Sequence, residues 1–223
     1  MPLDTNAVNV VVEPESRPSL PPPPLGRGLL VAIGALVVIT WLGAALVVPL
    51  SVHYPLLLIA LNPWPRHIIL VAPTTPIEWL VPIAALRGLC ACAVSFEVGR
   101  RYGPQGIRII ERRSAGLGRF VRLAERVFAW VGPLVVFVFP SPLTSSLAAV
   151  SGTSRALTLT LSLLGFAAWA YIYHRVGDLL APYTEAILGF FKRNMVEATL
   201  ACILLVVGYQ WIARKRRLAK ADS

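Results

Sequence analysis

The stretch "VGPLVVFVFPSPLTSSLAAVSGTSR", residues 131–155, decides how the rest of the chain must be interpreted. It is almost entirely apolar up to Phe139, is interrupted by Pro140-Ser141-Pro142 and a group of hydroxyl residues, and is apolar again over residues 147–150. A soluble loop is not this apolar. An uninterrupted transmembrane helix does not carry two prolines at its centre, because proline removes a backbone donor and clashes with the preceding turn. The pattern predicts two apolar legs joined by a break.

An earlier stretch, "HYPLLLIALNPWPRHIILVAPTTP" (residues 53–76), follows the same plan. Its apolar legs, residues 56–61 and 68–71, are too short to cross a bilayer, which takes about 20 helical residues. Between them lies Asn62-Pro63-Trp64-Pro65-Arg66. Broken backbone at membrane depth is tolerated only inside protein or beside water. The sequence therefore predicts two helical hairpins whose turns lie within the membrane domain.

The composition points to a membrane protein. Of 223 residues, 56% are hydrophobic and 14% are charged, against about 25% charged in soluble domains. Residues 29–50 carry no charge. This apolar run is too long for the hydrophobic region of a cleaved signal peptide, and further apolar segments follow it. The net charge of +10 comes largely from clusters within residues 100–126 and 214–217. Both clusters flank apolar segments, which indicates the positive-inside rule rather than nucleic-acid binding; attraction to anionic lipid is compatible with it.

The chain divides into a proline-rich, disordered cytoplasmic arm (residues 1–27), a membrane domain (28–213) and a basic cytoplasmic tail (214–223). Four consecutive prolines favour a stiff polyproline II arm without a core. We predict spans over residues 29–50, 77–98, 157–173 and 195–213, an amphipathic basic segment over 99–125 along the inner surface, and a polar loop over 175–193.

These elements predict an all-α integral membrane protein with about four transmembrane helices and two opposed re-entrant hairpins. From a cytoplasmic N-terminus, the first hairpin enters from outside and the second from the cytoplasm, and every strongly basic segment falls in the cytoplasm. Two such units indicate an inverted repeat with the site at their interface. We expect the cell membrane as the location, with both termini cytoplasmic.

Two motifs carry a resemblance. "FEVGRRYG" contains Phe96, Gly99, Arg100 and Gly103, and "FPSPLTSSLAAVSGTSR" contains Phe139, Pro140, Gly152, Ser154 and Arg155. Over about residues 55–173 the chain resembles the DedA family, also called VTT-domain or SNARE-associated Golgi membrane proteins, and its first hairpin looks like that of actinobacterial members.

The resemblance implies movement of lipids between leaflets, polyprenyl phosphates in bacteria or phospholipids in eukaryotes, with proton coupling through membrane carboxylates. The chain departs from the family at three places. Cys92 stands where the family has an acidic residue, the turn at residues 141–144 lacks the usual arginine, and Ser151 replaces a glycine.

A lipid phosphate that crosses the midplane needs cations or donors beside it, since uncompensated charge in hydrocarbon costs at least several kcal/mol. Broken helix ends also present N–H groups that suit anions. The candidate phosphate-binding side chains are arginines and the hydroxyls of the second break: Arg66, Arg87, Arg100, Arg155, Ser141, Thr144 and Ser145.

Glu78 and Glu97 are the candidate proton carriers, and each has a structural alternative. Glu78 opens a span, where a carboxylate suits the helix N-terminus, and Glu97 precedes two arginines with which it could pair. Arg155 could equally be a positive-inside anchor. Arg87 lies near the middle of its span, where an arginine costs roughly 2.5–3.5 kcal/mol on insertion scales, so it is either functional or held by another segment.

The remaining reactive side chains suggest no cofactor, no metal and no enzyme. Cys90 and Cys92 are two apart and point in different directions on a helix. All three cysteines lie in apolar surroundings, and we expect them to be buried free thiols. The three histidines are scattered and are expected at membrane interfaces. The expected partners are membrane lipids, above all an anionic lipid phosphate, and the chain is compatible with a homo-oligomer. A non-transporting protein that organises lipids or partner proteins at the cytoplasmic surface is the alternative function.

Overall fold

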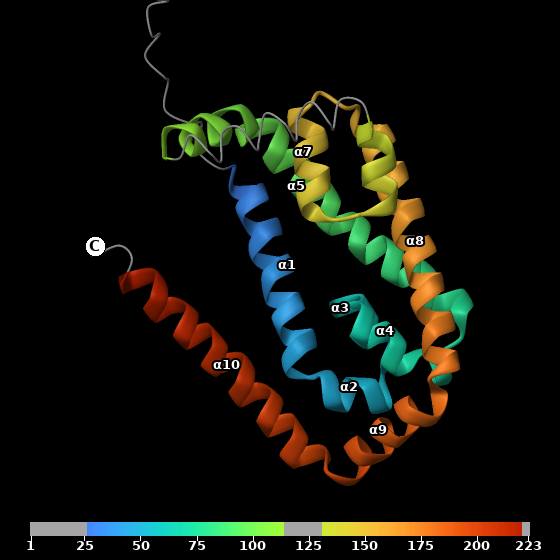
Figure 1. The fold of residues 1–223 in the computed structure, drawn as a ribbon. Helices are drawn as coiled ribbons and strands as arrows, with labels where there is room; N and C mark the ends of the chain where they lie inside the picture. The colour runs from blue at the N-terminus through green and yellow to red at the C-terminus, as the bar shows by residue number, and fades with distance from the viewer. Residues whose placement is uncertain (1–25, 114–130, 220–223) are drawn as a thin grey trace, which may run out of the picture.

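The computed structural model describes the backbone of residues 26–113 and 131–219, and the side chains of residues 26–103 and 131–211. All regular structure in these residues is helical, as predicted (Figure 1). The helices are α1 (Arg27–Ala45), α2 (Val47–His53), α3 (Pro55–Leu61), α4 (Pro65–Val71), η1 (Ala72–Thr74), α5 (Ile77–Arg113), α7 (Pro142–Val150), α8 (Arg155–Leu179), α9 (Ala181–Arg193) and α10 (Met195–Ala219). Residues 131–138 are also helical.

Three of these helices are long and apolar enough to cross a membrane: α1, residues 77–103 of α5, and α8. A shorter apolar helix runs from Met195 to Trp211. Much of their apolar surface faces outward, with Val31 70%, Leu204 71% and Leu205 73% exposed. Water would penalise so much exposed apolar surface, whereas lipid does not. The fold is that of an all-α membrane protein.

Both predicted interruptions are present, because proline removes a donor at each. Helix α3 ends at Leu61 and α4 begins with Pro65, while the helix over residues 131–138 ends before Pro140 and α7 begins with Pro142. Pro65 and Pro142 occupy the first helical position, where a missing N–H costs nothing. In each break, the first helix ends before the first proline and the next helix begins at the second proline.

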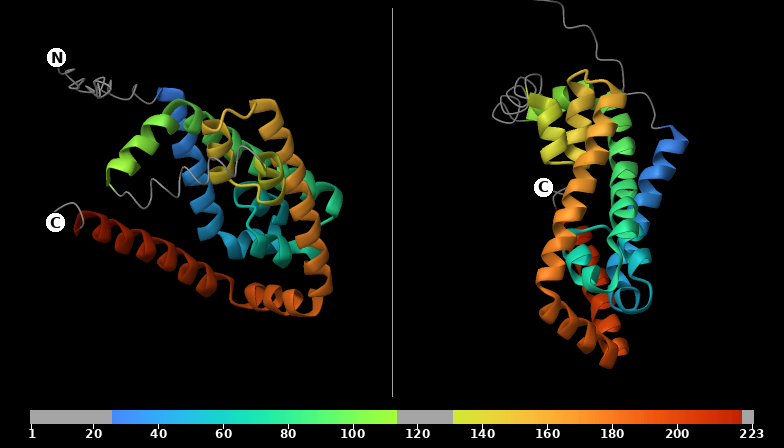
Figure 2. Two further views of the ribbon diagram at one scale, coloured as in Figure 1. Left: turned by 45° about the horizontal axis from the view of Figure 1, so that its top comes forward. Right: turned by 90° about the vertical axis from the view of Figure 1, so that its right-hand side faces the viewer.

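The two hairpins point toward each other (Figures 1 and 2). Helices α5 and α8 lie side by side as the long central pair; α7 and residues 131–138 approach them from one end of the molecule, and α3 and α4 from the other. Helix α1 covers α3 and α5, and α9 crosses the far end before α10. The main apolar core lies around the first hairpin and includes Leu58, Ile59 and Leu80, which are fully buried.

Glycines let the second hairpin sit directly on the central pair. A Cβ at Gly99 of α5 would meet the backbone of Ser146 in α7, and a Cβ at Gly165 of α8 would meet the carbonyl group of Phe137. Only glycine permits such close backbone approach. The Gly99 of the sequence motif is thus a packing residue.

Two sequence predictions need correction. The expected polar loop over residues 175–193 is helical, because α8 continues to Leu179 and α9 follows from Ala181, with Thr184 and Leu188 buried on its inner side. The expected span over residues 29–50 bends at Leu46, between α1 and α2. Pro49 lacks the N–H that would continue the helical ladder there.

Candidate functional site

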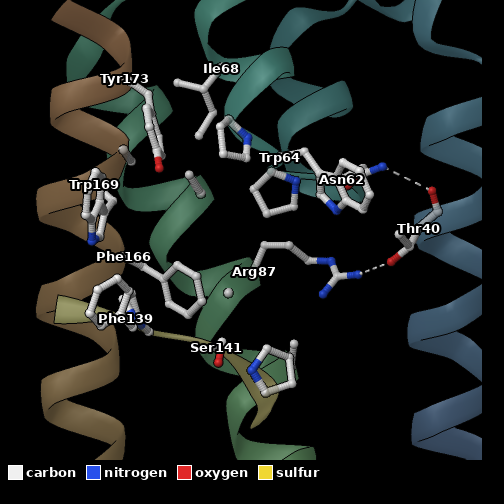
Figure 3. A pocket seen from close by; sticks show the side chains of 18 of the residues that line it. Thr40, Asn62, Trp64, Ile68, Arg87, Phe139, Ser141, Phe166, Trp169 and Tyr173 are labelled. Atoms are coloured by element: carbon white, nitrogen blue, oxygen red, sulfur yellow. Dashed lines mark hydrogen bonds between the residues drawn. The ribbon is translucent and has the colours of Figure 1, made fainter. Parts of the chain in front are cut away.

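A pocket of about 670 Å³ lies where the two helix breaks meet (Figure 3). Its wall combines both breaks with the middle of α5 and α8 and one residue of α1: Thr40, Asn62, Pro63, Trp64, Pro65, Ile68, Ala84, Arg87, Gly88, Ala91, Val138, Phe139, Pro140, Ser141, Pro142, Phe166, Trp169, Ala170 and Tyr173. The volume falls within the range of small-molecule sites, about 300–1,000 Å³. The wall is mostly apolar, with few polar groups.

Arg87 is the cation of this pocket. One terminal nitrogen, Nη2, donates to Thr40 Oγ1 at 2.9 Å and to the carbonyl oxygen of Leu36 at 3.5 Å, so the side chain is held by α1. The other terminal nitrogen is directed away from Thr40 (Figure 3). Nε is buried and has no hydrogen-bond partner. Arg87 therefore keeps unused donor capacity beside the pocket.

No carboxylate of the described residues lies within ion-pair distance of Arg87; the described ion pairs involve Glu97 and Asp178. A partly buried cation without a counter-ion attracts an anion strongly, because the surrounding medium screens charge poorly. Arginine also suits phosphate, whose oxygens match its planar donors. The pocket is thus built to accept a small anionic group.

The first break is tied to Arg87 through α1. Asn62 Nδ2 donates to the Thr40 carbonyl oxygen at 3.4 Å, and His67 Nδ1 lies 2.9 Å from the Asn62 carbonyl oxygen. Arg66 Nε donates to His67 Nε2 at 3.3 Å, and the guanidinium lies 4.4 Å from the centre of the Trp64 ring. A continuous set of contacts thus joins the hairpin turn to the pocket cation.

The second break is held by hydrogen bonds between its own residues and by one bond from α8. Ser141 Oγ accepts from the Thr144 N–H and Thr144 Oγ1 accepts from the Ser141 N–H, each at 3.1 Å, which forms a capping box at the start of α7. The carbonyl oxygen of Val138 accepts from Trp169 Nε1 at 2.7 Å. Side chains therefore satisfy the Ser141 and Thr144 N–H groups and the Val138 carbonyl oxygen, which has no helical donor because residue 142 is proline.

Aromatic side chains form the wall opposite Arg87. Trp169 and Tyr173 of α8 stack with their ring centres 5.3 Å apart, and Phe139 and Phe166 lie below them in the same wall (Figure 3). Phe166 packs where a side chain at Gly88 would otherwise lie, since a Cβ there would come within 2.6 Å of its ring. This wall suits the apolar part of a ligand whose charge lies at Arg87.

Two of the predicted phosphate-binding residues line the pocket, and the others lie beside it or outside it. Arg87 and Ser141 line the pocket, and Thr144 shares the capping box of α7 with Ser141. Ser145 is fully buried with its hydroxyl 3.4 Å from Ser162 Oγ, so it helps to pack α7 on α8. Arg66 is exposed at the first break and does not line the pocket; it contacts Trp64, which does.

The other predicted site residues lie outside the pocket. Arg100 is exposed and, with Arg101, pairs with Glu97 at 2.8 and 2.6 Å. Arg155 is exposed in the first turn of α8, and Glu78 is exposed in the first turn of α5. The structure therefore does not bring Glu78 or Glu97 to Arg87.

Sequence reasoning missed several residues of the site. Thr40 had a usable signal, since it is the lone hydroxyl of residues 29–50, but its partner could not be inferred. His67 and His174 were expected at interfaces, yet they are only 3% and 6% exposed. Among the described residues, no group of His, Cys, Asp or Glu is arranged to hold a metal. The cysteines at positions 90, 92 and 202 are free thiols, but of the three only Cys92 is buried; Cys90 is exposed and Cys202 is half-buried, so the expected burial is wrong for these two.

Comparison of the chain with protein-family models, with curated proteins and with solved structures finds no match.

Proposed function

We propose that this protein binds the phosphate of an anionic lipid in the pocket between its two helix breaks and moves that lipid between membrane leaflets. One observation carries the proposal: two interruptions far apart in the sequence line a single pocket together with an arginine that has no carboxylate partner among the described residues. Discontinuous helices that meet at a site near the membrane midplane are typical of transporters built from inverted repeats. The resemblance to the DedA family supports the same function.

In this proposal α1, α5, α8 and α10 cross the membrane, and the two hairpins re-enter it from opposite leaflets. The starts of α1 and α8 lie at one end of the bundle, beside residues 99–103 of α5 (Figure 1). The charged residues described there are Arg27, Arg100, Arg101 and Arg155 against Glu97. At the other end they are Arg175, Lys192 and Arg193 against Glu78, Asp178, Glu185 and Glu197.

The first end therefore has four basic residues and one acidic, and the second has three basic and four acidic. The positive-inside rule then assigns the first end, with the N-terminus, to the cytoplasm. Because the basic tail follows α10, which rises again from the second end (Figure 1), the C-terminus is cytoplasmic too. We place the protein in the cell membrane.

The proposal is tested by reconstituting the protein into vesicles that contain fluorescent phosphatidylglycerol and adding a quencher that cannot cross the membrane. The wild-type protein should move labelled lipid from the inner to the outer leaflet, so that its fluorescence is quenched. Arg87→Gln should slow this at least about tenfold, since a hydrogen bond to a charged group contributes about 1.5–3 kcal/mol. Arg27→Gln is the matched control, because Arg27 is an exposed arginine outside the pocket. Equal rates for Arg87→Gln and wild type would contradict the proposal.

A second function is favoured by the exposed arginines. Arg100, whose side chain is 60% exposed, and Arg155 lie on the surface rather than in the pocket. They could hold anionic lipids or partner proteins at the cytoplasmic face without transport. Vesicles that retain probe in the inner leaflet with wild-type protein, while Arg100→Gln and Arg155→Gln weaken binding to anionic vesicles, would favour this function instead.

A further inference from the structure

We propose that His67 is the proton-binding residue that is coupled to anion binding in the Arg87 pocket. The inference rests on the proposed function, because it requires the pocket to bind an anion. It assigns the coupling to a histidine of the first hairpin instead of to Glu78 or Glu97.

The hydrogen bonds of His67 define its protonation state. Arg66 can only donate, so His67 Nε2, which receives the Arg66 Nε–H at 3.3 Å, must carry a lone pair. His67 Nδ1 lies 2.9 Å from the Asn62 carbonyl oxygen, which can only accept, so Nδ1 carries the hydrogen. The structure therefore contains neutral His67 with the proton on Nδ1.

A second proton on His67 would disrupt this arrangement. Nε2–H would then face the Arg66 Nε–H, so two donors and two positive charges would oppose each other. Arg66 is exposed and can move away, whereas His67 is 3% exposed and cannot. Protonation would thus release Arg66 from His67 and from its position over the Trp64 ring.

Two routes connect His67 with the pocket. The first runs from His67 to the Asn62 carbonyl, from the Asn62 side chain to Thr40, and from Thr40 to Arg87. The second runs through Arg66 to Trp64, which lines the pocket. An anion at Arg87 would favour positive charge on His67, and positive charge on His67 would favour the anion, because coupling between two binding events is reciprocal.

The charged and titratable groups around α4 leave His67 without a carboxylate partner among the described residues. Helix α3 and η1 contribute none. On α2, His53 is exposed and bonded to the Pro49 carbonyl oxygen. On α8, Tyr173 is half-buried and stacks on Trp169 in the pocket wall. The other groups on α8 and α9 are exposed or engaged with each other: Arg155, Tyr171, His174, Arg175, Asp178, Tyr183, Glu185, Lys192 and Arg193. Arg66 is the charged group that touches His67.

His174 is a less suitable coupling residue. Its Nε2 lies 2.9 Å from the Thr75 carbonyl oxygen and its Nδ1 lies 3.2 Å from Asp178 Oδ2. Both neighbours are acceptors, so His174 lacks the opposing donor that Arg66 places against His67 Nε2. Neither Thr75 nor Asp178 lines the pocket.

The experiment uses the full-length protein in nanodiscs of neutral lipid and a short-chain probe, dihexanoyl phosphatidylglycerol. Its phosphodiester keeps one negative charge over the range in which histidine titrates, about pH 5 to 8. Tryptophan fluorescence reports binding, since Trp64 and Trp169 line the pocket. Ring-nitrogen NMR of ¹⁵N-histidine protein reports the protonation of His67 directly. The chain has three histidines, so the His67 signal is assigned as the one that remains in both His53→Gln and His174→Gln.

We expect the affinity of the wild-type protein to fall by up to about tenfold per pH unit as His67 loses its proton. His67→Gln should bind with little dependence on pH, and the control His53→Gln should behave as wild type. The NMR signal of His67 should change from the neutral form with hydrogen on Nδ1 to the charged form when probe is added at constant pH.

The inference is overturned if saturating probe leaves the His67 signal unchanged, a result that holds even if His67→Gln fails to fold. It is also overturned if His67→Gln retains the pH dependence of the wild type. Absence of probe binding at every pH would instead contradict the proposed function, and the coupling with it.

Discussion

The two helix breaks have the same Pro-x-Pro pattern but differ in the polar groups that hold them. The second break is held by neutral groups, the Ser141–Thr144 capping box and the Trp169 Nε1 donor from α8. The first break includes the charged Arg66 beside His67, and its Asn62 side chain bonds to α1. It also leaves Asn62 Oδ1 buried without a partner.

This difference indicates a division of roles. A polar network that is closed and neutral holds one geometry, whereas an incompletely satisfied network with charges can change partners at lower cost. The second hairpin is therefore expected to act as the rigid side of the pocket, and the first as the side that responds to ligand and proton.

The comparison depends first on the hairpins entering from opposite sides. In a cysteine-free background, Tyr54→Cys at the start of the first hairpin and Ala156→Cys beyond the second place thiols at exposed positions. An impermeant thiol reagent should label Tyr54→Cys only from outside and Ala156→Cys only from the cytoplasm, because the bilayer separates them. Labelling of both cysteines from the same side would contradict the inverted arrangement of the two hairpins.

Packing of the hairpins gives the next largest effect. Gly99→Ala should lower stability by about 1–3 kcal/mol, because the new methyl group meets the backbone of Ser146, which cannot turn away. Gly43→Ala, behind the first hairpin, meets the Cβ atoms of Asn62 and Leu61 at 2.9 and 3.0 Å and should cost less if that hairpin yields.

Thermal unfolding in detergent measures both changes. Gly34→Ala is the control, since nothing lies within 4 Å of the added atom and alanine is favoured in a helix. Equal losses for Gly43→Ala and Gly99→Ala would mean that the two hairpins are equally rigid.

The smallest effect concerns the cap of the second break. Ser141→Ala should destabilise the protein by about 1 kcal/mol through loss of the N-cap of α7. Ser146→Ala is the matched control, because its hydroxyl bonds to the Leu143 carbonyl oxygen within the same helix and caps nothing. If chemical unfolding finds Ser141→Ala no less stable than Ser146→Ala, the second break is not maintained by its capping box.

Much of the architecture could be predicted from the sequence, because it follows from local chemistry. Apolar runs of the right length predicted three of the spans, and prolines at residues 63, 65, 140 and 142 predicted both interruptions. The failures have local causes as well. Residues 175–193 looked polar, yet their polar and apolar side chains alternate with a helical period that buries Thr184 and Leu188.

The candidate site could be predicted only in part. Arg87 was singled out because an arginine in mid-span needs a reason, and Ser141 because it lies in the break. Arg100, Arg155 and the two glutamates lie near the ends of spans, and the sequence alone does not show whether helix packing turns such a charge toward a pocket or toward the surface.

The sequence by itself determined that this chain is helical, apolar and interrupted twice, since hydropathy and proline act over a few neighbouring residues. Only the tertiary structure decided that the two interruptions share one pocket, that Thr40 holds Arg87, and that His67 lies neutral against Arg66. Thr40 lies 22 positions from Asn62 and 47 positions from Arg87 in the sequence, yet it bonds to both. The geometry of these contacts depends on how whole helices pack, which no local pattern specifies.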